Sequence, residues 1–211
     1  MEFLKVLSMV AFLASLCDAL YYRTDTPCDF TGVSIDDEVL SRLITRLPEG
    51  LESGPEGLYM LFPGFEVGRQ TFHGLSKLQK FGPTIPYCAN GTRMVQADFF
   101  SDDDTHFWSP WKTCSGDEGR VVVRAGFTRF TLQFRVVDSS ASGVKLEFHR
   151  ALPVTVQGVR LEVEGAGRVV RGVFEVLSML LPSFVEELWM GQFFQNLHKG
   201  FRSMNEENAF M

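Results

Sequence analysis

The sequence predicts an α+β protein in which a curved antiparallel β-sheet rolls around a long, bent C-terminal helix, with one further helix near the N-terminus. Three observations predict this fold. Apolar residues recur every fourth position near the start of the chain, alternate with polar residues through its middle, and return to helical spacing near its end. A sheet with one apolar face can roll around an apolar helix, because each buries the other's apolar surface.

The first nineteen residues have the features of a secretory signal peptide. The apolar run over 6–16 is shorter than the about 20 residues of a membrane-spanning helix, and residues 17–19 supply small side chains for cleavage. We therefore expect a secreted protein whose mature chain begins at Leu20 and forms a single domain over 20–211. A retained N-terminal helix is the alternative. No later segment is predicted to span a membrane.

The first element of the mature chain is a helix that begins at Ser34. Ser34 can cap it, and the acidic residues that follow favour the positive end of the helix dipole. Pro48 and Gly50 end it. One face of this helix is apolar and carries Ile35, Val39, Leu43 and Leu47.

The next part of the chain has the character of strands and turns. Residues 58–81 form a long extended stretch, and the Pro-rich segment 82–91 is predicted to be a turn region. A strand follows over 93–100. Residues 101–119 are predicted to be an acidic loop, with two tryptophans that cover the mouth of the barrel or form an exposed contact patch.

The clearest strands lie in the second half of the chain. After a short Val-rich strand at 120–125, apolar and polar residues alternate over 127–137. A hairpin loop follows at 139–143, and alternation resumes over 144–150 and in further segments up to residue 163. Consecutive strands of this kind predict an antiparallel meander with one apolar side.

The last element, over 168–202, is predicted to be a bent helix or two helices. Pro182 interrupts it, and Ser183 followed by Glu186 forms a capping box from which a fresh helix can start. A helix that is apolar on most of its circumference must be buried on most of it. We expect residues 203–211 to be frayed.

This order of elements resembles the group 7 mite allergens and, more distantly, the TULIP-type lipid-binding superfamily of bactericidal/permeability-increasing, juvenile-hormone-binding and takeout proteins. The resemblance covers 34–202, and the insert 101–118 departs from it. It is carried by 35–47, by the strand 65–82 with its stretch 74–82, and by 93–100, 127–137, 144–150 and 168–202. It implies a non-enzymatic fold that holds an apolar ligand between sheet and helix.

Large apolar side chains on both elements agree with such a site, because lipid cavities are lined in this way. The alternative for each residue is an ordinary place in the core. We expect a common cavity bordered by Phe130, Phe134, Phe148, Val173 and Leu177. The full set of expected ligand-binding residues is Phe65, Phe72, Leu78, Phe99, Phe130, Leu132, Phe134, Leu146, Phe148, Val173, Phe174, Leu177 and Leu181.

Three cysteines remain after cleavage, and secreted proteins keep disulfides. Cys88 and Cys114 flank one strand-and-loop unit, so we expect them to pair. Cys28 is then a free thiol or an intermolecular link, although its pairing with either of the others stays open. Asn90 begins an Asn-Gly-Thr sequon in a predicted turn, which suits N-glycosylation.

Other chemistry is not predicted. A net charge of -6 without a basic run argues against nucleic acid as a partner. The four histidines are scattered without metal-ligand spacing, and the acidic run 102–104 lacks the periodicity of calcium loops. No nucleophile elbow is present, and Gly165-Ala166-Gly167 is a strand-to-helix turn rather than a dinucleotide loop. We expect no enzyme activity, no cofactor and no metal site, and the oligomeric state is open.

The leading functional hypothesis is therefore a secreted carrier of a lipid or another small apolar molecule. The first alternative is a secreted protein with a solid core that acts on another protein through its surface. The second is a lipocalin. A lipocalin would place most strands before its main helix and a Gly-x-Trp near its start, whereas this sequence begins with a helix and lacks that motif.

Overall fold

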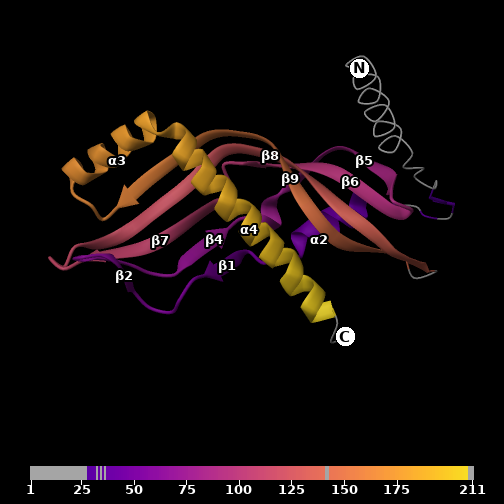
Figure 1. Cartoon of the computed structure of the whole chain (residues 1–211), viewed down its shortest axis with the longest axis horizontal. Coiled ribbons are helices and arrows are strands. Elements are labelled where there is room, and N and C mark those ends of the chain that lie inside the picture. Colours follow the sequence, from indigo (N-terminus) through magenta and orange to yellow (C-terminus); the bar gives the residue numbers. More distant parts are fainter. Residues whose placement is uncertain (1–27, 32, 34, 36, 141–142, 209–211) are drawn as a thin grey trace, which may run out of the picture.

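The computed structural model describes residues 28–208, apart from 32, 34, 36 and 141–142. They form one mostly antiparallel sheet of nine strands, with a helix before it and two helices after it (Figure 1). The predicted α+β class is confirmed, and the sheet is not closed into a barrel. The predicted signal peptide lies outside the described residues.

The helix before the sheet is α2 (Asp37–Thr45). Asp37 and Glu38 lie in its first turn, where carboxylates favour the helix dipole. The side chains that pack inward are Leu40 and Ile44, which are almost fully buried. Of the predicted apolar face only Leu47 is buried, and Ile35, Val39 and Leu43 are half-buried. The helix is confirmed, whereas its expected cap, Ser34, lies outside the described residues.

The stretch predicted to be extended over 58–81 is divided into short elements. Gly74 has a φ of 92°, a left-handed conformation that suits glycine and that ends one strand just before a 3-10 turn. The elements here are β1 (Gly50–Ser53), β2 (Tyr59–Phe62), β3 (Phe65–Val67), β4 (Gln70–His73) and the 3-10 turn η1 (Leu75–Lys77).

Two segments predicted to be irregular are strands. The prediction of a Pro-rich turn region at 82–91 was wrong, because most of these residues belong to β5 (Gln79–Ala89). This is an edge strand, in which proline is tolerated. The prediction of a loop over 101–119 was also wrong. It contains the end of β6 (Thr92–Asp102) and all of β7 (His106–Thr113).

The predicted meander of several short strands is instead one long hairpin of β8 (Glu118–Ser140) and β9 (Gly143–Glu164). Gly126 lies between Ala125, which pairs with Val159, and Phe127, which pairs with Gln157. Gly126 and Gly158 therefore face each other at the point where the sequence suggests an interruption. Glycine in a ladder permits a local bend without ending the pairing.

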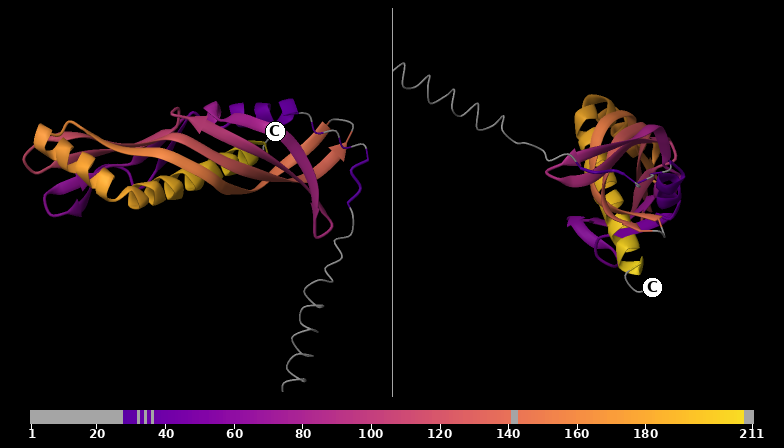
Figure 2. Two further views of the ribbon diagram at one scale, coloured as in Figure 1. Left: turned by 90° about the horizontal axis from the view of Figure 1, so that it is seen from above. Right: turned by 90° about the vertical axis from the view of Figure 1, so that its right-hand side faces the viewer.

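Strand β8 pairs with three other strands of the sheet, β6, β7 and β9. One edge pairs with β7 over its first part and with β6 over its second part, and the other edge pairs with β9 along its length. The strand order is β1-β4-β7-β8-β6-β5, with β3 on β7 and β2 on β3. The sheet is long and strongly twisted (Figure 2).

The chain ends in α3 (Arg168–Leu180) and α4 (Pro182–Asn208). The predicted break at Pro182 is confirmed, because proline is accepted at the first position of a helix but not inside one. Helix α4 crosses the concave side of the sheet, and α3 lies against β9 at one end of the molecule (Figures 1 and 2). None of the described helices is long and apolar enough to cross a membrane.

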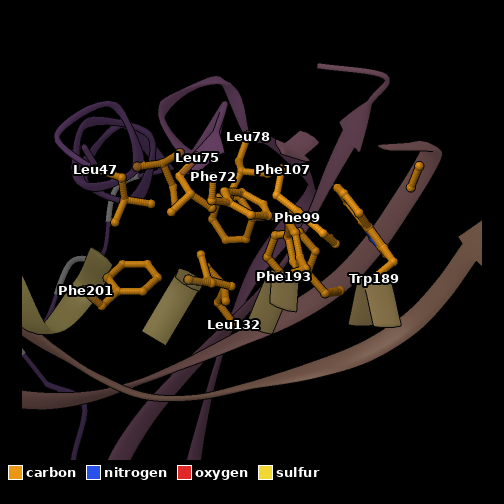
Figure 3. Packing of buried hydrophobic residues seen from close by; sticks show 14 of the residues in the cluster. Leu47, Phe72, Leu75, Leu78, Phe99, Phe107, Leu132, Trp189, Phe193 and Phe201 are labelled. Carbon is orange, nitrogen blue, oxygen red and sulfur yellow. The ribbon is translucent and has the colours of Figure 1, made fainter. Parts of the chain in front are cut away.

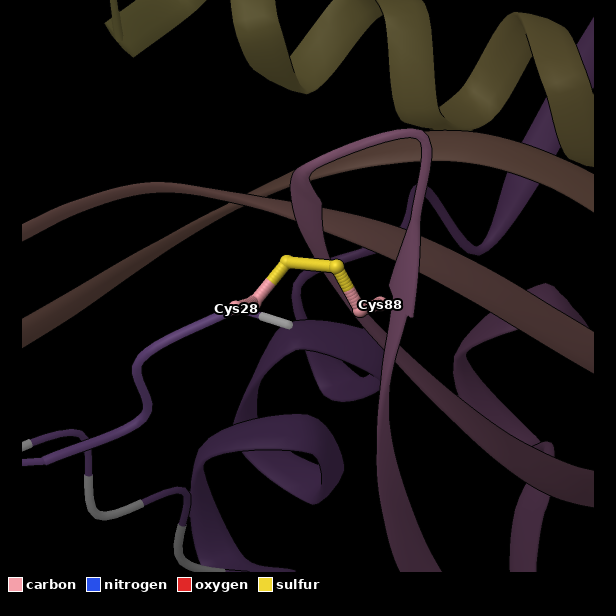
Figure 4. The surroundings of a disulfide bond; sticks show 2 residues. All are labelled: Cys28 and Cys88. Carbon is pink, nitrogen blue, oxygen red and sulfur yellow. A yellow bond between two sulfur atoms is a disulfide. The ribbon is translucent and has the colours of Figure 1, made fainter. Parts of the chain in front are cut away.

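A disulfide joins Cys28 to Cys88 (Figure 4), with a Cα–Cα distance of 5.5 Å. Cys114 is a free, exposed thiol. The expected Cys88–Cys114 pair was therefore wrong. Cys88 lies near the part of β6 that pairs with Arg135, whereas Cys114 lies beside Glu118. These positions on β8 are separated by about 55 Å of strand, at about 3.3 Å per residue.

Candidate functional site

Most of the predicted ligand-binding residues come together in one aromatic core between the sheet and α4 (Figure 3). The sheet residues in this core project from its concave face. Those that are buried are Phe72, Leu78, Phe99, Phe130, Leu132 and Phe134, and Leu146 and Phe148 pack against them half-buried.

Aromatic rings of α4 occupy the space in front of these side chains. Phe193 meets Phe130 edge-on at 5.0 Å between ring centroids. Phe201 stacks on Phe148 at 4.3 Å and meets Phe134 at 5.8 Å. Phe130 and Phe134 have no exposed surface, so this part of the interior is packed by the chain's own side chains.

Trp189 of α4 is the largest fully buried side chain and was missed as a core residue by the sequence analysis. It stacks on Phe107 at 5.9 Å, and its Nε1 donates a hydrogen bond to Thr128 Oγ1. The buried face of α4 repeats every four residues, which could have identified it: Val185, Trp189, Phe193, Leu197 and Phe201. Leu188 and Phe194, which also follow helical spacing, lie beside this face and are only half-buried.

Several inward-facing side chains at the end of β9 nearest α3 are only half-buried. Val159 and Leu161 of β9 pair with the core residues Ala125 and Val123, so they project from the same concave face. Both are only half-buried although they face the interior. Phe174 of α3 is also half-buried. The side chains of Val173 and Leu177, which were expected to border a cavity, lie outside the described residues.

Two of the predicted residues do not join the core around α4. Phe65 stacks on Trp111 at 5.9 Å between centroids, where β3 pairs with β7. Leu181 is 52% exposed between α3 and α4. Trp111 is buried in strand β7, so it does not form a loop that covers a barrel mouth.

The end of the molecule that holds α3 carries exposed apolar side chains. They come from two places that both views put at this end, the α3–α4 junction and the segment around β2 (Figures 1 and 2). The first group is Val176, Met179, Leu180, Leu181 and Phe184, and the second is Leu58, Tyr59, Met60 and Leu61. Groups of exposed large apolar side chains such as these often mark a binding surface.

No protein-family model matches the chain, and no curated protein matches it.

Proposed function

We propose that this protein is a secreted, non-enzymatic carrier of a small apolar molecule such as a lipid, with a TULIP-like arrangement in which the ligand lies between α3 and the concave face of the sheet. The single observation that carries the proposal is that Val159 and Leu161, which project from the inner face of β9 where α3 lies against that strand, are only half-buried, as is Phe174 of α3. Phe130 and Phe134 under α4, by comparison, are sealed by rings.

A ligand that covers half-exposed apolar side chains on the inner side of a sheet removes their remaining apolar surface from water, and this favours binding. Burial of apolar surface contributes about 25 cal/mol per Å². An apolar molecule placed against Leu161 and Phe174 would remove water from both the sheet and the helix. The same molecule under α4 would first have to displace Phe193 or Phe201, which costs the packing that those rings already have.

The apolar groups at the α3–α4 junction and around β2 support entry of the ligand at this end. Val176, Met179 and Leu180 lie on the exposed side of α3, so the helix presents apolar surface to the solvent. An apolar ligand that leaves a membrane or an aggregate would meet these side chains first. The Cys28–Cys88 disulfide supports the secreted location, because such bonds persist in oxidising compartments.

Native mass spectrometry of the protein from its natural source tests this proposal. We expect a copurified apolar compound of one discrete mass that is removed by extraction with organic solvent. A protein that is free of any such compound, and that acquires none from a total lipid extract, would contradict the carrier function and favour a protein that acts through its surface.

A further inference from the structure

A polar groove of about 430 Å³ opens on the face of the sheet opposite α4. Its side chains alternate along β4, β7 and β8 with the core residues Phe72, Phe107 and Val123, so they project from the other face. The volume lies within the range of small-molecule sites. The groove is thus separated by the sheet from the apolar interior.

Two histidines and an arginine form a row across this groove. His73 lies directly opposite His106, which lies directly opposite Arg124. The imidazole rings are stacked with centroids 5.3 Å apart. Arg160 of β9 continues the row beyond Arg124. Side chains that face each other across antiparallel strands share one face, so the row brings four basic groups together.

A glycine fixes the approach of β4 to β7. A Cβ atom at Gly74 would lie 2.3 Å from the carbonyl oxygen of Asp104, and its φ of 92° also disfavours other residues. Gly74 therefore allows the end of β4 to lie close against residue 104. This contact sets His73 beside His106.

The charges of the groove balance only while the histidines are neutral. Arg120 pairs with Glu164 at 2.7 Å, and Lys77 lies 3.8 Å from Glu49. With Arg124 and Asp104, the lining carries three cationic and three acidic side chains. Protonation of the two histidines would therefore add up to two positive charges that no acid of the lining offsets.

The guanidinium of Arg124 has a hydrogen-bond donor without an acceptor among the described residues. Its guanidinium makes one long ion pair, 3.6 Å to Glu162. Its Nε is buried, and the described part of the chain offers it no hydrogen-bond acceptor. The Arg124 side chain as a whole is 33% exposed and lines the groove, so a ligand can contact its guanidinium there. Trp108 lines the groove beside it, with the Arg120 guanidinium 5.5 Å from its ring centroid.

We propose that this groove binds a sulfate- or phosphate-type oxoanion group, held by Arg124 and the stacked His73–His106 pair, and that binding takes up protons and strengthens as the pH falls from about 7.5 to about 5.5. A guanidinium and two imidazolium groups donate charge-assisted hydrogen bonds to such oxygens. A metal does not explain the pair, because the described residues hold no cluster of three metal-ligating side chains.

The electrostatics of His106 agree with this dependence on pH. Burial lowers its pKa first, and the nearby His73, Arg124, Lys77 and Arg120 lower it further. The charged groups that shift this pKa are thus cationic, and the lining of the groove also holds Glu49, Asp104 and Glu164. A bound anion would offset the positive neighbours and raise the pKa, so by linkage protons and anion must bind together.

Isothermal titration with inorganic sulfate at about pH 5.5 and about pH 7.5 tests the proposal, because sulfate keeps its charge across this range while histidine does not. We expect at least about tenfold tighter binding at the lower pH. Repeating the titration in buffers of different ionisation enthalpy should reveal proton uptake. Arg124→Gln should abolish binding, and His106→Gln should remove most of its pH dependence.

Arg135→Gln and His149→Gln are the matched controls, since both residues lie on exposed parts of the same long hairpin away from the groove. Both should bind sulfate as the unaltered protein does. Binding to vesicles of phosphatidylcholine with phosphatidylglycerol, compared with binding to vesicles of phosphatidylcholine alone, tests whether the anion can belong to a lipid headgroup. Binding of either source that requires Arg124 supports the proposal.

A measurement on the unaltered protein avoids any folding defect of the variants. The imidazole proton resonances of His106 should titrate at higher pH when sulfate is present than when it is absent. The proposal is overturned if neither sulfate nor anionic vesicles bind at about pH 5.5, or if Arg124→Gln binds as well as Arg135→Gln.

Discussion

Trp189 Nε1 donates a hydrogen bond to Thr128 Oγ1 at 3.1 Å, and this bond joins the first third of α4 to the centre of β8. Trp189 is fully buried and Thr128 is 1% exposed. Each satisfies a polar group that would otherwise be buried without a partner. The bond therefore fixes the position of α4 along the sheet as well as its distance from it.

Trp189→Phe should lower the free energy of unfolding by about 2–4 kcal/mol, because it removes the donor and leaves a small void. Thr128→Val should cost about 1–3 kcal/mol, because the indole N–H loses its acceptor. The double variant should cost less than the sum, since neither polar group remains. Urea unfolding of all four proteins measures this, and strictly additive costs would argue against the bond.

The disulfide gives a second prediction. Cys28 and Cys88 are 60 residues apart in the sequence, so their link restricts a long loop of the unfolded chain. The Cys88→Ser variant should lose about 2–5 kcal/mol of stability. Cys114→Ser, the exposed thiol, should be neutral. Peptide mapping without reduction should recover Cys28 linked to Cys88, and recovery of Cys114 in a disulfide-linked peptide would disagree with the structure.

Asp98 gives a prediction for acid stability. Its burial raises the pKa of the carboxyl, but hydrogen bonds from Thr131 and Arg129, at 2.6 and 2.5 Å, outweigh burial and hold the pKa below 3.8. A depressed carboxyl pKa stabilises the fold above the ordinary pKa, and this contribution is lost as the pH falls through the lowered value.

Asp98→Asn should therefore cost about 1–2 kcal/mol at neutral pH, and the difference from the unaltered protein should shrink below about pH 4. Glu147→Gln is the control, because Glu147 forms a similar but more exposed pair with Arg135 at 3.5 Å. Thermal unfolding as a function of pH measures both. A cost at Asp98 that does not change with pH would show that its charge plays no part.

Asn90 gives a prediction for modification. It is exposed in the tight turn between β5 and β6, with a φ of 52° and Gly91 after it. We expect an N-linked glycan at Asn90 when the protein is made in a eukaryotic secretory pathway. Enzymatic deglycosylation should reduce its mass by one glycan, and Asn90→Gln should show no such change. An unmodified Asn90 in secreted material would contradict this expectation.

The sequence predicts the order of the elements well, because local patterns determine them. The four-residue repeat of α2, the alternation in β8 and β9, and the break at Pro182 are all local. The disulfide partner of Cys88, in contrast, is not determined by a local pattern. It depends on the separation of β5 and β7 by other strands, which no spacing along the chain reveals.

The candidate site was predicted only in part for a similar reason. Alternation identifies the inner face of the strands, which is why Phe99, Phe130 and Phe134 were placed correctly in the interior. It does not tell which part of that face a helix seals. The row of His73, His106 and Arg124 was missed because its members belong to three strands that are distant in sequence.

The most direct test of the carrier function is a titration with an apolar fluorescent probe on two matched variants. Leu161→Trp adds volume beneath α3, and Phe134→Trp adds volume beneath α4. We expect saturable binding of one probe to the unaltered protein. Leu161→Trp should weaken that binding and leave stability nearly unchanged, whereas Phe134→Trp should lose about 1–3 kcal/mol of stability and still bind.

Unfolding curves for both variants, measured alongside the titration, separate loss of the site from loss of the fold. Binding that is weakened by Leu161→Trp and kept by Phe134→Trp would agree with a ligand between α3 and the sheet. Absence of saturable probe binding to the unaltered, folded protein would contradict the carrier function.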